Sequence, residues 1–157
     1  MKIIIRAGGV LRSGPETEMV NDYIGRAAKL TRGCGFLGVE EQAVDLRNAK
    51  NRQQETRQII APLKGLSTPV VVLDERGKDV TSRQIAKSLA NWRDEGHAQI
   101  HILIGGADGF DPAALPQHVQ KWCLGRATWP HKLVRVMIAE QIYRALSILN
   151  GSPYHRD

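Results

Sequence analysis

Apolar and polar residues follow one another in blocks that predict strands and helices in alternation. Residues 2–5, 36–46, 70–73 and 99–104 are rich in β-branched and other apolar residues and predict strands. The unbroken apolar run at 70–73 is typical of a strand buried on both faces of a parallel sheet. Between these runs, apolar positions recur every three or four residues, which is the spacing of a buried helix face. The alternation predicts an α/β fold with a mainly parallel sheet and helices on both faces.

Local capping signals predict where the helices begin. Ser13 and Glu16 stand at capping-box spacing, so we expect the first helix to begin there. Thr81 is suited to cap a later helix, whereas the charged residues just before it, 74–78, predict a turn. The same reasoning predicts an exposed helix at 48–60 and a last short strand at 119–124.

The last predicted helix, residues 130–149, is apolar around most of its circumference. Such a helix has to be covered on more than one side. The sheet can cover one side, and we expect a second subunit to cover the other, which predicts a homodimer. The alternative is a helix packed centrally within one chain.

Length and composition restrict the class of protein. With 157 residues, of which 42% are hydrophobic and 24% charged, the chain has room for one complete core, and we expect a single domain over residues 1–157. Its apolar start is shorter than a signal-peptide core or a membrane span. Neither Cys34 and Cys123 nor the five histidines show the spacing of metal ligands. We therefore expect a cytoplasmic protein with no metal and no membrane anchor.

The charge balance favours an anionic partner. Lys and Arg outnumber Asp and Glu by 22 to 16, for a formal net charge of +6. Nucleic acid is one partner that such a balance suits, although many basic proteins of this size bind none.

A glycine cluster follows the strand predicted at 99–104. Gly105, Gly106 and Gly109 stand where open α/β sheets bind ligands, and backbone without side chains lets a ligand approach closely. The spacing differs from the dinucleotide fingerprint, so a nicotinamide site is not predicted. The cluster is equally consistent with a tight structural turn.

The C-terminal tail includes three residues suited to nucleotides. Tyr154 offers a ring for stacking, His155 a titratable ring and Arg156 a guanidinium that can bind phosphate. This set suits contacts with nucleotides. The alternative is a disordered basic end, and in either case we expect the tail to contribute little to the stability of the fold.

Four segments, taken together, resemble the RlmH family, the pseudouridine methyltransferases of large-subunit ribosomal RNA within the SPOUT superfamily. They are SGPETEMVNDYIGR, LDERGKDVTS, HILIGGADG and, most specifically, PHKLVRVMIAEQIYRALSILNGSPYHR. The resemblance implies a SPOUT-type α/β knot, with the C-terminal segment threaded as a trefoil knot, and a homodimer. It also implies S-adenosyl-L-methionine-dependent methylation of the N(3) imide nitrogen of a pseudouridine in bacterial 23S ribosomal RNA, on the assembled ribosome.

The resemblance also implies which residues hold the methyl donor, mostly through backbone groups and apolar walls. They are Leu73, Gly105 and the run Leu124, Gly125, Arg126, Ala127, Thr128 and Trp129. Similar proteins tend to carry serine and a larger apolar residue where this chain has Gly125 and Ala127. This chain therefore lacks the serine hydroxyl contact and has a smaller apolar side chain against the adenine. We expect the backbone contacts of the loop to retain binding of the methyl donor.

Methyl transfer needs in-line attack by the imide nitrogen, which must first lose its proton. Arg156 would favour the deprotonated ring, and His155 would accept or relay the proton, with Tyr154 beside them as the stacking surface. Asp108 and Glu140 remain alternative bases.

Two rival functions stay open on sequence alone. One is a noncatalytic RNA- or ribosome-associated protein of the same fold, suggested by the altered loop at Gly125 and Ala127 and by the basic charge. The other is a SPOUT methyltransferase that acts on transfer RNA or on another ribosomal nucleotide.

Overall fold

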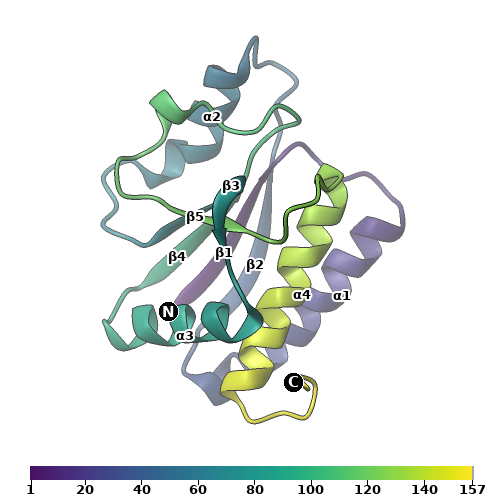
Figure 1. The fold of residues 1–157 in the computed structure, drawn as a ribbon, viewed down its shortest axis with the longest axis vertical. Coiled ribbons are helices and arrows are strands. Elements are labelled where there is room, and N and C mark those ends of the chain that lie inside the picture. Colours follow the sequence, from purple (N-terminus) through teal and green to yellow (C-terminus); the bar gives the residue numbers. More distant parts are fainter. Residues whose placement is uncertain (157) are drawn as a thin grey trace.

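A computed structural model describes residues 1–156 and shows a single sheet flanked by helices (Figure 1). The strands are β1 (Lys2–Gly8), β2 (Gly38–Val44), β3 (Val70–Asp79), β4 (Gln99–Ile104) and β5 (Gln120–Cys123). The α-helices are α1 (Pro15–Leu30), α2 (Arg52–Ile60), α3 (Ser82–Asp94) and α4 (His131–Leu149), with short 3₁₀ turns at Arg32–Cys34, Ala61–Leu63 and Pro112–Ala114.

The strand order is β2-β1-β4-β3-β5, and every neighbouring pair is parallel. This confirms the predicted parallel sheet. The central strands β1 and β4 carry isoleucines on the same face, and Ile3, Ile5, Ile100 and Ile102 are fully buried. Because the strands are parallel, their carboxyl ends lie at one edge of the sheet, where β1 runs into Gly9 and β4 into Gly105.

Helices cover both faces of the sheet, as predicted. The isoleucines of β1 and β4 belong to a large core shared with α1, α3 and α4. On the opposite face, Val72 and Leu103 pack with Ile59 of α2 and Leu63 of the following 3₁₀ turn. The side with three helices therefore holds most of the core, and α2 covers the other face beside the carboxyl ends of the strands.

Helix α4 runs between α1 and α3 (Figure 1). Ile138, Ile142 and Leu146 are fully buried, and the ring of Tyr143 meets that of Tyr23 on α1 at 6.2 Å. The sequence argument for a second subunit is thus corrected, because one chain covers most of the apolar circumference of α4. What remains is a partly exposed strip that includes Leu133, of which 40% is exposed. The homodimer and the trefoil knot stay predictions.

Two local predictions were wrong and one was confirmed. The cap of α1 is Gly14 rather than Ser13, and Gly14 has a φ of 155° that favours glycine. Residues 74–78 belong to β3, because after an irregularity Lys78 and Asp79 pair with β5, so their polarity marks exposure rather than a turn. The predicted cap at Thr81 is correct, and it forms a complete capping box with Gln84.

Candidate functional site

A cavity of about 490 Å³ opens at the carboxyl ends of β3, β4 and β5. Its walls come from Leu73, the glycine segment 105–109, the end of β5, the loop 124–129 and the start of α4. The position is where open parallel sheets bind ligands, and the volume lies within the range of small-molecule sites.

The glycines of this cavity make a tight turn that also leaves room for a ligand. Gly106 and Gly109 form an isolated bridge, with the Gly109 amide donating to the Gly106 carbonyl at 3.0 Å. A Cβ on Gly105 would lie 2.8 Å from the carbonyl carbon of Gly109, so that position accepts glycine alone. The two interpretations of the glycine cluster are therefore compatible, because the same backbone closes the turn and lines the cavity.

The structure brings almost all of the predicted cofactor residues together. Seven of them line the cavity: Leu73, Gly105, Leu124, Gly125, Ala127, Thr128 and Trp129. Arg126 does not line it; its side chain is 92% exposed and lies 3.5 Å from Asp79. Gly125 has a φ of 106°, a conformation that a serine would adopt only with strain, so the backbone of this loop is suited to glycine.

His131 lines the same cavity and was not among the predicted site residues. Its Nε2 lies 2.7 Å from the Gly105 carbonyl oxygen, which accepts, so Nε2 carries the proton. Burial lowers the pKa of His131, the bond to Gly105 opposes that shift, and Arg135 lowers the pKa further. The ring is therefore neutral at pH 7. From sequence, His131 was considered only as a possible metal ligand; the informative signal was a histidine at the first helical position directly after the cavity loop.

The cavity combines apolar walls with a charged rim. Trp122 and Trp129 add aromatic surface to the apolar side chain of Leu73. At the rim, Asp74 lies 3.4 Å from Lys121, and Arg52 of α2 adds a second cation. Such a site suits a ligand with a flat, largely apolar part and a charged end.

The tail is held against α4, in contrast to the expectation of a chain end that contributes little to the stability of the fold. The Tyr154 hydroxyl donates to Glu140 at 3.0 Å, and the Tyr154 ring lies 4.5 Å from that of Tyr143. The Arg144 guanidinium pairs with Glu140 at 2.5 Å and stands 4.7 Å from the centre of the Tyr154 ring. Burial, followed by the bond to Glu140, raises the pKa of Tyr154.

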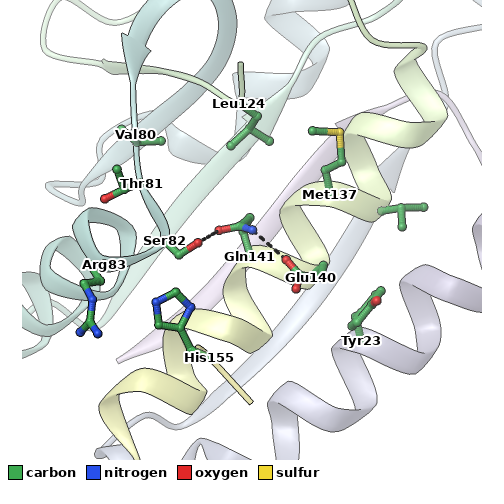
Figure 2. Close-up of a pocket in the computed structure, with 11 residues that line it drawn as sticks. Tyr23, Val80, Thr81, Ser82, Arg83, Leu124, Met137, Glu140, Gln141 and His155 are labelled. Carbon is green, nitrogen blue, oxygen red and sulfur yellow. Dashed lines mark hydrogen bonds between the residues drawn. The ribbon is translucent and has the colours of Figure 1, made fainter. Parts of the chain in front are cut away.

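A second hollow, of about 660 Å³, lies between the start of α3, the middle of α4 and the tail (Figure 2). His155 and Glu140 both line it, and the Ser82 hydroxyl donates to Gln141 at 2.8 Å across it. Leu124 lines both hollows, so the two are neighbours. Asp108 belongs to the first hollow, and Arg156 is exposed at the surface.

Residues 1–156 contain neither a metal-binding cluster nor a membrane-spanning helix. Within this range no three His, Cys, Asp or Glu side chains are grouped so that they could hold a metal ion. The same residues include no helix with the length and apolar character needed to cross a membrane. Both cysteines, Cys34 and Cys123, are buried free thiols.

Comparison with known proteins gives concordant matches over nearly the whole chain. A family model described as "Predicted SPOUT methyltransferase" matches residues 1–155. The chain is 46% identical over 157 residues to "Ribosomal RNA large subunit methyltransferase H" of Maricaulis maris, covering 100% of both chains. Relatives with the same name from Cereibacter sphaeroides and Rhizobium etli are 45% and 43% identical, each with 99% of both chains covered.

Proposed function

The chain belongs to the SPOUT methyltransferase family, and from this premise we propose that it methylates N(3) of a pseudouridine in bacterial 23S ribosomal RNA. The methyl donor is S-adenosylmethionine and the substrate is the assembled ribosome. Relatives at 40–46% identity that are named as large-subunit ribosomal RNA methyltransferases support the reaction and its substrate class. The net charge of +6 suits an RNA partner, and a ribosomal substrate places the protein in the cytoplasm.

One observation carries the proposal: three segments far apart in the sequence meet in one cavity at the carboxyl edge of the sheet. They are β3 at Leu73, where its regular pairing with β5 is interrupted, the glycine turn at Gly105 and the loop from Leu124 to Trp129. All three segments carry residues that the family resemblance implies for the methyl donor.

The residues present fit S-adenosylmethionine, which supplies an electrophilic methyl group on a sulfonium sulfur. The apolar and aromatic walls at Leu73, Trp122 and Trp129 would hold the nucleoside, and the glycine turn would let it approach the backbone. The mixed charges of Asp74, Lys121 and Arg52 suit an amino-acid group, which carries both signs.

The second hollow is the proposed place of the target nucleotide. His155 lines it and would accept the imide proton, and the exposed Arg156 would contact phosphate or the developing ring anion. Glu140 is a poorer base, because its Oε1 already accepts from Tyr154 and Arg144. Tyr154 fixes the tail through these contacts, so that His155 is presented to the hollow.

We also propose a homodimer through the strip of α4 that α1 and α3 leave partly exposed. Leu133 and Met137 lie one turn apart on this strip, and Met137 borders the second hollow (Figure 2). An apolar strip that continues into a hollow suits the surface of a second copy.

Titration calorimetry with S-adenosylmethionine in the presence of a chelator tests the donor site directly. The proposal predicts binding that does not depend on metal. Absence of heat at millimolar donor would overturn the enzymatic proposal and favour a noncatalytic RNA-associated protein. For a protein that binds, single-turnover methylation of ribosomes by His155→Ala and Arg156→Ala variants tests the tail: donor affinity should persist while the rate falls.

A further inference from the structure

We propose that His131 is a positioning residue for the donor cavity, and that its neutral imidazole holds the Gly105 carbonyl in the orientation that the bound donor requires. The inference deepens the proposed function and rests on it. It starts from the 2.7 Å contact between Nε2 of His131 and the Gly105 oxygen, which joins the first residue of α4 to the end of β4.

The contact with His131 acts on the carbonyl of Gly105, at the start of the glycine turn. The Gly106–Gly109 bridge closes the far side of the turn, and the backbone of Gly109 leaves no room for a side chain at Gly105. The Gly105 carbonyl lies at a buried residue, and His131 supplies its hydrogen-bond donor. Without that donor, the carbonyl has to turn toward water, and the turn changes shape inside the cavity.

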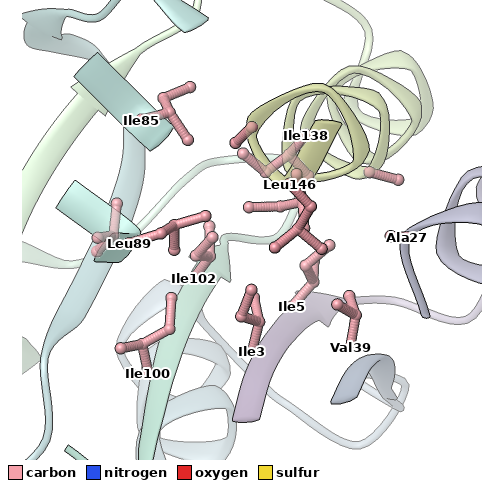
Figure 3. Close-up of a cluster of buried hydrophobic side chains, with 14 of the residues drawn as sticks. Ile3, Ile5, Ala27, Val39, Ile85, Leu89, Ile100, Ile102, Ile138 and Leu146 are labelled. Atoms are coloured by element: carbon pink, nitrogen blue, oxygen red, sulfur yellow. The ribbon is translucent and has the colours of Figure 1, made fainter. Parts of the chain in front are cut away.

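Helix α4 has other anchors, so His131 is not needed to keep the helix in place. Arg135, one turn further on, donates to the Gly9 carbonyl at 2.8 Å and forms a buried ion pair with Glu41. Beyond it, Ile138 and Leu146 pack against the isoleucines of β1 and β4 (Figure 3). Loss of the imidazole should therefore disturb the glycine turn locally and leave the fold intact.

The charge of His131 also matters, because the donor is cationic at sulfur. Nε2 donates in both the neutral and the protonated ring, so protonation leaves the contact in place and adds a positive charge to the cavity wall. Arg135 lies beside the ring on α4, and the other charged groups of the cavity are Arg52, Asp74, Glu75, Arg76, Asp108 and Lys121. The cavity itself has three cations and three carboxylates, so a protonated ring would give it a net positive charge and should weaken binding of a cation.

The test is titration calorimetry with S-adenosylmethionine on purified wild type, His131→Leu, His131→Asn and His131→Gln. Leucine removes the donor and asparagine is too short to reach Gly105, so both should weaken binding by about tenfold or more, as expected for an unpaired buried acceptor. Glutamine places an N–H near the Nε2 position and should restore most of the affinity. Lys132→Gln, an exposed neighbour on the same turn, is the matched control and should bind as wild type.

Two further readouts separate positioning from general damage. Melting temperatures should stay close to wild type in all four variants, so that a loss confined to the leucine and asparagine variants reports the contact. For wild type, affinity for S-adenosylmethionine should fall as the pH drops below about 6.5, the ordinary histidine pKa, because the His131 pKa is lowered, while affinity for S-adenosylhomocysteine, whose sulfur is uncharged, should fall less.

Wild-type affinity in His131→Leu, or a glutamine variant as weak as leucine, would overturn the role of His131 and leave the proposed function standing. Wild-type protein that binds no donor would instead overturn the proposed function itself.

Discussion

The Tyr154 hydroxyl donates to Oε1 of Glu140 at 3.0 Å, and this contact joins the C-terminal tail to the middle of α4. The same carboxylate pairs with Arg144, whose guanidinium lies over the Tyr154 ring. Because burial and the bond to Glu140 raise the pKa of Tyr154, the phenol remains a donor throughout the neutral range. The tail is thus part of the folded structure through Tyr154 and through His155, whose Nδ1 lies 3.5 Å from Nη1 of Arg144.

Tyr154→Phe should lower the free energy of unfolding by about 1 kcal/mol, the usual net value of one hydrogen bond, because the ring contacts remain and only the bond to Glu140 is lost. Arg156→Ala, at an exposed position, is the matched control and should leave stability unchanged. Urea denaturation followed by circular dichroism measures both. Equal stability of wild type and Tyr154→Phe would show that the tail is not held in solution as it is here.

Arg135→Met should destabilise the protein by about 2 kcal/mol or more, because it leaves the partly buried Glu41 carboxylate without its ion-pair partner and the Gly9 carbonyl without its donor. The double variant Arg135→Met, Glu41→Met removes both charges and should recover much of the loss. Urea denaturation of both variants separates the effect of the unpaired charge on the free energy of unfolding from the effect of the changed side-chain volume. A double variant less stable than Arg135→Met would contradict this account.

His101 should make the protein less stable in weak acid. Its ring is 3% exposed, and burial, followed by the charge of Arg6, lowers its pKa below the ordinary 6.5, with Glu40 opposing. The unfolded chain therefore binds a proton near pH 6.5 that the folded chain does not bind. The free energy of unfolding should be unaffected above this pH and should fall below it, down to the folded-state pKa. His101→Leu should reduce the slope, and an identical slope would rule out this assignment; His131 contributes in the same direction.

Met137→Glu should convert a dimer into monomers, because it places a charge on the partly exposed strip of α4 beside the second hollow. Met19→Glu is the matched control, since Met19 is 44% exposed on α1 and lies outside that hollow. Sedimentation velocity gives the mass of each. Finding the unmodified protein as a stable monomer would remove the dimer proposal, and dissociation by both substitutions would place the interface elsewhere.

Sequence alone was sufficient where the signal is local. The apolar runs of β4 and of the first half of β3, the cap at Thr81 and the glycine turn all rest on neighbouring residues, and the structure has them as predicted. The second half of β3 was missed because it is a strand only through its pairing with β5. The charged residues of this segment do not predict that pairing.

Contacts between residues far apart in the chain could not be predicted from local sequence patterns. The bond from His131 to Gly105 spans 26 positions, and that between Tyr154 and Glu140 joins a tail to a helix. Periodicity showed that α4 is apolar on several sides, but it did not show that α1 and α3 cover those sides. The cofactor residues came from family resemblance, which carries long-range information that one chain's pattern lacks.

Mapping of methylated nucleotides in 23S ribosomal RNA, from cells with and without this protein, tests the central claim most directly. We expect one pseudouridine that carries a methyl group on N(3) in the first sample and is unmethylated in the second, with the modification restored by the wild-type chain. We expect no restoration by a chain truncated after Ser152, which lacks Tyr154, His155 and Arg156. Identical methylation in both samples, or a difference confined to transfer RNA, would contradict it.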